Sequence, residues 1–192
     1  MEIMGCSNMS KNMADGIVFI GHMGAGKSYF LERFIKEWNK LDTTPINRVS
    51  IASNIKEIAT NYFGMKDKDR TLLQSIGSKM REVDREVWIK ALMLKIANNN
   101  LVPFGIDDVR FLNELKMIKS KYNVIVVKLE QPEQERLNEY KKLYGRFPTT
   151  EELTDRTEAE IDSLPFDYLI VNNYSPEDFK QHFHTLLTLM IS

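Results

Sequence analysis

The stretch that most clearly carries chemistry is Gly21 to Ser28, which reads GHMGAGKS and fits the pattern G-x-x-x-x-G-K-[ST]. In this pattern the glycines let the backbone turn sharply and bring its N–H groups against phosphate oxygens, where a Cβ would obstruct. Lys27 adds a positive charge for the β- and γ-phosphates, and the Ser28 hydroxyl is a ligand for Mg²⁺. His22 is interpreted as a spacer without chemistry. The predicted ATP-binding residues are Gly21, Met23, Gly24, Ala25, Gly26, Lys27, Ser28 and Tyr29.

An acidic pair, Asp107 and Asp108, ends the apolar run LVPFGI. Open α/β sheets bind ligands at the carboxyl ends of their strands, and an acidic residue there holds nucleotide-bound Mg²⁺, usually through water. We therefore predict that Asp108, with Asp107 in reserve, lies on the metal side together with Ser28. Aspartate is also a favoured N-cap, so a role in capping the following helix stays open.

Arginines are distributed where two phosphate groups could be brought together, and the planar fork of arginine suits phosphate oxygens. Arg81 and Arg110 fall on the core side, where the acceptor is expected. The charged segment 131–164 carries three more, which are Arg136, Arg146 and Arg156. Each could instead be a solvated surface residue, because isolated surface charges usually contribute little. The predicted catalytic residues are Lys27, Arg81, Arg136 and Arg146.

Such a site needs a fold that brings the ends of several strands together. Short apolar runs alternate with helical stretches, which is typical of a parallel sheet covered on both faces. The runs predicted to be strands are 17–20, 49–52, 101–106, 124–129 and 168–171. The fold class is therefore α/β, a three-layer P-loop fold with a five-stranded parallel sheet and helices on both faces.

Helical periodicity fills the segments between these runs. Helices are predicted from about Lys27, from Asn54 and from Leu112, and over 70–97 with a break at Gly77. The last helix is expected to have Ser175 as its N-cap, followed by a proline at the first helical position.

The segment 131–164 differs from the rest because it is rich in charge and thin in apolar residues. Thr149 and Glu152 form a capping-box pattern within it. We predict a mobile lid here and an acceptor-binding helical region over 54–100, both inside one domain at 16–192. Residues 1–15 are interpreted as a flexible leader.

The composition limits the classes of function. The 26 Lys and Arg residues nearly balance 27 Asp and Glu, so the net charge of −1 gives no basic excess for stable nucleic-acid binding. Cys6 is the only cysteine, which excludes an intramolecular disulfide and agrees with a reducing compartment. No apolar run reaches the roughly 20 residues of a membrane span. A cytoplasmic protein with small-molecule partners is expected, and a monomer and a homodimer both stay open.

Several segments resemble the bacteriophage deoxynucleoside monophosphate kinases, a branch of the nucleoside monophosphate kinases. They are the phosphate-binding loop, RTLLQSIGSKMREVDREVW, DDVRFLNE and FDYLIVNN, and the resemblance spans residues 16–173. It implies ATP and Mg²⁺ as cofactors, transfer to a deoxynucleoside 5′-monophosphate, and the host cytoplasm if the origin is a phage. The acceptor-binding residues it implies are Ser50, Lys56, Arg81, Asp84, Trp88, Asp108 and Arg110.

Two segments depart from the pattern of that family. SIASNIKEIA lacks the expected aromatic residue after the serine and the expected proline. Asp155-Arg156-Thr157-Glu158 stands where His-x-Ser-Glu is expected, so base specificity and the role of Glu158 are left open.

Two other functions fit the same motif. A P-loop kinase acting on a hydroxyl, such as that of a nucleoside or dephospho-coenzyme A, needs a carboxylate base, for which Asp84, Asp107 or Asp108 could serve. A P-loop ATPase that drives assembly or nucleic-acid movement is disfavoured by the near-neutral charge.

Overall fold

The computed structural model describes residues 13–41, 43–153, 156–172 and 175–192. Most of the expected leader lies outside these residues, but its end belongs to the fold. Ala14 is buried, and its N–H donates to the Met190 carbonyl at 2.7 Å. The N–H of Asp15 donates to the Asn123 carbonyl at 2.7 Å, so the ordered domain begins before Gly16.

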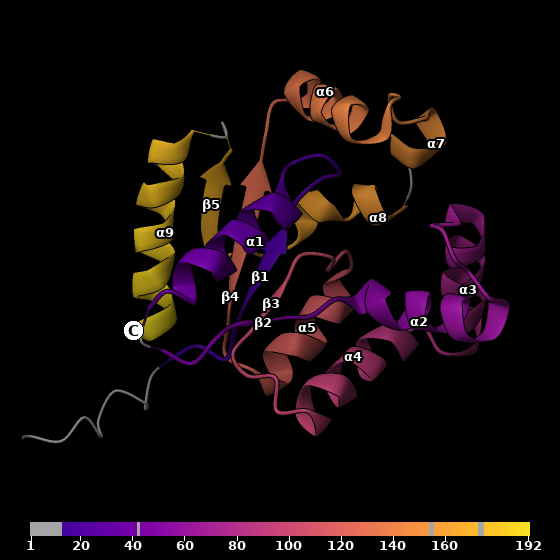
Figure 1. The fold of residues 1–192 in the computed structure, drawn as a ribbon, viewed down its shortest axis with the longest axis horizontal. Helices are drawn as coiled ribbons and strands as arrows, with labels where there is room; N and C mark the ends of the chain where they lie inside the picture. The colour runs from indigo at the N-terminus through magenta and orange to yellow at the C-terminus, as the bar shows by residue number, and fades with distance from the viewer. Residues whose placement is uncertain (1–12, 42, 154–155, 173–174) are drawn as a thin grey trace, which may run out of the picture.

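A five-stranded sheet forms the centre of the molecule, with all its paired strands parallel, as predicted (Figure 1). The strand order is β2-β3-β1-β4-β5. The strands are β1 (Gly16–Ile20), β2 (Asn47–Arg48), β3 (Phe104–Ile106), β4 (Val124–Glu130) and β5 (Tyr168–Val171). Because β1 lies in the middle, the loop that follows it opens at the point where the chain crosses over to the other side of the sheet.

Alternation along the central strands divides the core into two layers. In β1, Val18 and Ile20 face one layer while Ile17 and Phe19 face the other. Helices α1 (Lys27–Trp38) and α9 (Pro176–Ile191) cover the Phe19 side with an aromatic cluster. Helices α2 (Ile51–Phe63), α4 (Val87–Asn98) and α5 (Leu112–Lys121) supply the opposite layer. The three-layer architecture is therefore confirmed.

The second predicted strand and its helix are displaced from their expected positions. Residues 49–52 were expected to be extended, but β2 ends at Arg48 and α2 already begins at Ile51 instead of near Asn54. The cause is Asp108, whose carboxylate accepts the backbone N–H groups of Ile51 at 3.0 Å and Ala52 at 2.8 Å. An N-cap supplied from another strand end starts this helix early.

The break predicted at Gly77 is wrong. Helix α3 (Arg70–Val83) runs through Gly77, and the break comes at Asp84, whose carboxylate accepts the Glu86 N–H at 2.9 Å. The Gly77 carbonyl instead accepts the indole N–H of Trp88 at 3.0 Å. This contact fixes α3, which projects away from the sheet in Figure 1, against α4.

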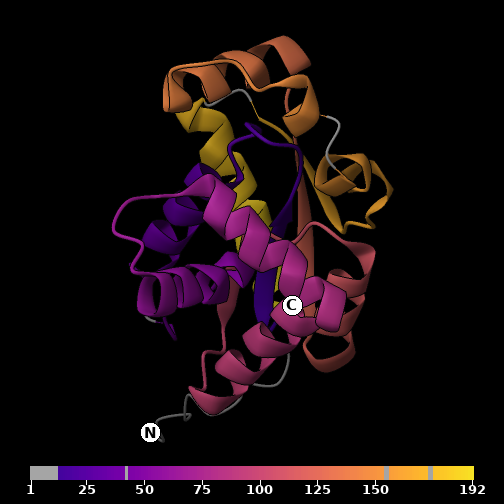
Figure 2. The same ribbon diagram turned by 90° about the vertical axis from the view of Figure 1, so that its right-hand side faces the viewer.

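Three short helices form most of the predicted lid. They are α6 (Glu133–Tyr144), α7 (Thr150–Leu153) and α8 (Arg156–Ala159), followed by the 3₁₀ turn η1 (Ile161–Ser163). The capping box is confirmed, since Glu152 accepts the Thr149 N–H at 2.9 Å and donates its own N–H to the Thr149 hydroxyl at 3.2 Å. Figures 1 and 2 place α6 and α7 beyond the carboxyl ends of the strands. No helix among the described residues combines the length and apolarity of a membrane span.

Candidate active site at the carboxyl ends of the strands

The loop between β1 and α1 has the backbone that its glycines predict. Gly24 and Gly26 have φ values of 83° and 87°, which residues with a Cβ rarely adopt. A Cβ on Gly24 would also lie 2.5 Å from the Arg136 carbonyl oxygen of α6. Helix α1 begins directly at Lys27, so the positive end of its dipole faces the loop. The loop is therefore shaped to bind an anion.

Lys27 is held inside the loop. Its side chain is 6% exposed, and Nζ donates to the carbonyls of Gly21 at 2.7 Å and His22 at 2.8 Å. Burial lowers the pKa of Lys27 well below its usual range, and the nearby charge of Arg110 lowers it further. Bound phosphates would oppose both effects, since an adjacent anion favours the ammonium form. The ammonium is thus positioned before any ligand arrives.

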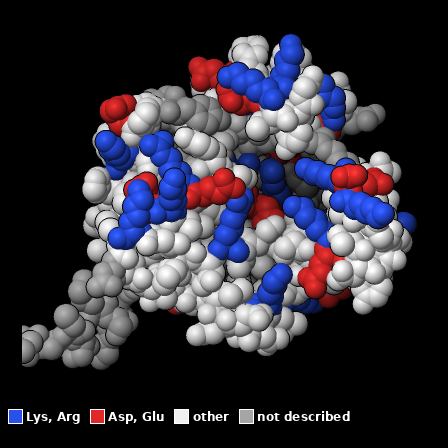
Figure 3. All heavy atoms as spheres, viewed as in Figure 1, with Lys and Arg blue, Asp and Glu red and all other residues white. Residues whose placement is uncertain are grey.

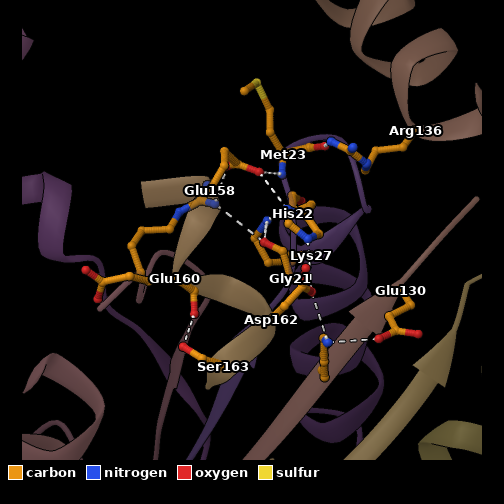
Figure 4. A network of polar contacts seen from close by, with 12 residues as sticks. Gly21, His22, Met23, Lys27, Glu130, Arg136, Glu158, Glu160, Asp162 and Ser163 are labelled. Atoms are coloured by element: carbon orange, nitrogen blue, oxygen red, sulfur yellow. Dashed lines mark hydrogen bonds and ion pairs between the residues drawn. The ribbon is translucent and has the colours of Figure 1, made fainter. Parts of the chain in front are cut away.

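Glu158 and His22 join the loop to α8, the last helix of the predicted lid (Figure 4). The Glu158 carboxylate accepts the Met23 N–H at 2.9 Å, the His22 Nδ1–H at 3.0 Å and an Arg110 guanidinium N–H at 2.9 Å. Burial alone would raise the pKa of Glu158, but the hydrogen bonds from His22 and Met23 and the charge of Arg110 lower it to about 2. Glu158 is therefore a buried, ionised carboxylate at the loop.

His22 has carboxylates on both ring nitrogens, because Nε2 lies 3.1 Å from Asp162 as well. The hydrogen bond to Glu158 raises the pKa of His22 against the effect of burial, and Asp162 raises it further. Two acceptors leave no place for a ring lone pair, so both nitrogens donate and the ring is an imidazolium.

This geometry predicts a pH dependence of stability. The pKa of His22 is higher in the folded state than in the unfolded state. The protonated ring therefore contributes fully to the stability of the fold below the unfolded pKa of about 6.5, and this contribution is lost as the pH rises through the folded-state pKa. Above pH 6.5 we expect the free energy of unfolding to fall less steeply in His22→Gln than in the unsubstituted protein. Urea denaturation at a series of pH values from 5.5 to 9 measures this difference. His182, whose pKa burial lowers, is common to both proteins and cancels in the difference. Parallel curves would contradict the assignment.

A large open cavity lies beside the loop, between α2, α3 and the lid. Its volume is about 1060 Å³, and Met23 of the loop lines it. Its charged lining is mainly cationic, and Figure 3 shows basic side chains around the hollow. The cationic lining residues are Lys56, Arg81, Arg85 and Arg146. The two acidic lining residues are already paired, Glu82 with Lys79 at 2.9 Å and Glu152 with Arg146 at 2.7 Å. The cavity fits an anionic ligand.

The structure brings only part of the predicted acceptor set to this cavity. Lys56 and Arg81 line it, and Arg110 lies next to it on Glu158. Trp88 is 2% exposed and packs in the core, while Asp84 bonds Lys90 at 2.8 Å at the turn between α3 and α4. Neither lines the cavity, because Trp88 is turned into the core against the Gly77 carbonyl and Asp84 is held at the turn by Lys90.

Two of the predicted acidic and polar residues are used to build the fold. Asp108 accepts the Ser50 hydroxyl at 2.7 Å in addition to the N-terminal N–H groups of α2. Asp107 is buried and pairs with Arg48 at 2.9 Å. The capping role left open for the pair is therefore real for Asp108, although the helix that it caps is α2 and not the one that follows. Its metal role stays a prediction.

The lid arginines differ in what they contact. Arg136 donates to the Met23 carbonyl of the loop at 2.9 Å. Arg146 makes a two-pronged pair with Glu152 at 2.7 and 2.9 Å. The side chain of Arg156 lies outside the described part of the chain. Of Arg136 and Arg146, only Arg136 therefore contacts the phosphate-binding loop.

Comparison with known proteins bears on the fold. No family model and no curated protein matches this chain. Among solved structures, TT1252 from Thermus thermophilus has a TM-score of 0.61 at 15% identity, covering 94% of this chain and 100% of its own. Shikimate kinase from Bacteroides thetaiotaomicron has a TM-score of 0.57 at 12% identity, covering 93% and 98%. A gluconokinase from Sinorhizobium meliloti has a TM-score of 0.57 at 15% identity, and the match covers 94% of this chain and 95% of the gluconokinase.

The chain has the P-loop kinase fold. The expected α/β architecture with a five-stranded parallel sheet is confirmed, and two of these similar structures are named as kinases. The resemblance to phage deoxynucleoside monophosphate kinases gains no support from them, since they bear other names.

The donors present fit a magnesium ion that is held mainly by the phosphates of the nucleotide. Ser28 is exposed at the first turn of α1, where its hydroxyl can reach a loop-bound phosphate. Among the described residues there is no group of three or more His, Cys, Asp or Glu side chains that could hold a metal by themselves. Mg²⁺ also keeps several waters and few protein ligands in phosphate-transfer sites.

Proposed function

We propose that this protein transfers the γ-phosphoryl group of ATP to a small acceptor that itself carries a phosphate, as a deoxynucleoside monophosphate does. The observation that carries the proposal is the cation-lined cavity that shares Met23 with the phosphate-binding loop. Its four cationic residues exceed its two acidic residues, of which Glu152 pairs with Arg146 of the lining and Glu82 pairs with Lys79 outside it. A phosphomonoester, with a charge of about −1.5 to −2 at pH 7, complements this lining.

The chain divides the work between the two ligands. Backbone N–H groups of the loop and Lys27 bind the β- and γ-phosphates, and Arg136 contacts the loop from the lid. Arg81 would orient the acceptor phosphate, with its guanidinium 5.7 Å from the centre of the Phe111 ring. When bound, Mg²⁺ supplies charge neutralisation at the phosphates.

A hydroxyl acceptor must lose its proton during transfer, and this requirement favours a phosphate acceptor at this site. An ionised phosphate is already a nucleophile, whereas a hydroxyl needs a nearby carboxylate base. The three candidates for such a base have other partners: Asp84 binds Lys90, Asp107 binds Arg48, and Asp108 caps α2. None of the three lines the cavity.

A hydroxyl acceptor is the second candidate, and one observation favours it. The solved structures with this fold include a shikimate kinase and a gluconokinase, and both named acceptors bear hydroxyl groups and a carboxylate. A carboxylate would also suit the cationic cavity.

A panel assay separates the two candidates. ADP release from Mg-ATP is measured with deoxynucleoside and nucleoside monophosphates, and in parallel with nucleosides, dephospho-coenzyme A, shikimate and gluconate. The proposal expects acceleration above the water-driven rate by at least one monophosphate and by none of the phosphate-free acceptors. Acceleration only by a hydroxyl acceptor would establish the second candidate instead.

A further inference from the structure

A lid-side carboxylate occupies the mouth of the phosphate-binding loop. Glu158 is 6% exposed, and its oxygens accept hydrogen bonds from the Met23 N–H, the His22 imidazole and the Arg110 guanidinium, each within 3.0 Å. In Figure 4 the side chain points from α8 toward the loop. A backbone N–H at a glycine-rich loop, an imidazolium and a guanidinium are the donors that a phosphate oxygen takes.

We propose that Glu158 is an internal anion that holds the loop in the absence of nucleotide, and that the phosphates of a bound nucleotide displace it. The inference rests on the proposed function in one respect, which is that the loop binds nucleotide phosphates. It adds a step to binding, because nucleotide exchanges with a carboxylate of the chain instead of entering a free site.

Charge balance supports an exchange. The nearby charge of Arg110 lowers the pKa of Lys27 and so disfavours its ammonium form, and the charge of Glu158 opposes this effect. A triphosphate brings more negative charge to the same cations, and its repulsion with a carboxylate only a few ångströms away is strong in a partly buried site. Arg110 therefore gains a better partner when phosphate arrives, and Glu158 loses one.

The contacts extend from Glu158 into the segment that carries it. His22 also donates to Asp162 of η1 at 3.1 Å, and Asp162 lies 3.3 Å from Lys128 of β4. Displacing Glu158 thus breaks one of the two hydrogen bonds from His22 to this segment. Nucleotide binding would in this way be coupled to the position of α8.

The substitution Glu158→Gln tests the proposal, because glutamine keeps the shape and an oxygen for the Met23 N–H but removes the charge. The probe is inorganic pyrophosphate, and its dissociation constant is measured by titration calorimetry at fixed ionic strength. We expect about tenfold tighter binding by Glu158→Gln than by the unsubstituted protein, as the loss of a like charge nearby predicts. The control is Glu160→Gln, whose carboxylate points away from the loop in Figure 4, and it should bind like the unsubstituted protein.

Equal or weaker binding by Glu158→Gln overturns the proposal, and so does an absence of pyrophosphate binding by both proteins. If Glu158→Gln does not fold, a crystal structure of the unsubstituted protein with bound ADP tests the displacement of Glu158 instead. The Glu158 carboxylate should then lie beyond hydrogen-bond distance of the Met23 nitrogen, and a carboxylate still bonded there refutes the displacement. Tighter pyrophosphate binding without any acceptor-dependent ADP release would leave this inference standing and reject the proposed function.

Discussion

Lys27→Met is expected to lower phosphoryl transfer by about a thousandfold while leaving the protein folded, the scale seen when a preorganised charge is removed from a transition state. The ammonium is buried at the loop and already aimed by two carbonyl hydrogen bonds, so its stabilisation of the transferring group needs little reorganisation. Methionine fills similar space without the charge. Turnover is measured as acceptor-dependent ADP release at saturating Mg-ATP.

Lys36→Met is the matched control, because Lys36 lies on the exposed side of the same helix. It should retain the unsubstituted rate. Thermal unfolding of both variants separates a lost charge from a lost fold. A Lys27→Met protein that melts normally and turns over within tenfold of the unsubstituted rate would show that the loop does not act on the transferred phosphate.

Arg81→Ala is expected to raise the KM for the acceptor by about 10- to 100-fold, the range for losing a hydrogen bond to a charged group. Arg81 lines the cavity, and its guanidinium is placed by the Gly77 carbonyl at 3.3 Å and by the face of Phe111. None of the ion pairs between described residues involves Arg81. Its charge therefore has no ion-pair partner among the described residues and is available to a ligand in the cavity. The KM for ATP should change by less than about threefold, since Arg81 does not touch the loop.

Lys66→Ala serves as the control, because Lys66 is exposed in the connection between α2 and α3 and does not line the cavity. Steady-state kinetics with each substrate varied in turn give both KM values. An Arg81→Ala effect on ATP alone, with the acceptor KM unchanged, would place the acceptor somewhere other than this cavity.

The strands that could be predicted are those built mainly from apolar residues. The five residues of β1 are buried, and the run GIVFI marks them without further context. The strand β2 was misplaced because it has only two residues, and the apolar residues after it enter α2. The cap that starts α2 comes from Asp108, more than fifty positions away, and no local pattern shows it.

The phosphate-binding loop could be predicted for a similar reason, since its function depends on eight consecutive residues. The contacts of His22 and Glu158 could not, because 136 positions separate the two. His22 was interpreted as a spacer, although a histidine beside a buried carboxylate carries charge. The only signal for Glu158 was its place in a motif whose other residues differ from the expected ones. Trp88 and Asp84 were placed at the acceptor by resemblance, and packing puts them elsewhere.

The product of the reaction tests the central claim most directly. The protein is incubated with Mg-ATP and the acceptor that gives the fastest ADP release, and the product is followed by ³¹P nuclear magnetic resonance. We predict a new pair of coupled diphosphate resonances from the acceptor, because the bond formed joins two phosphorus atoms through oxygen. A single uncoupled phosphomonoester resonance, or inorganic phosphate alone, would contradict a phosphate acceptor.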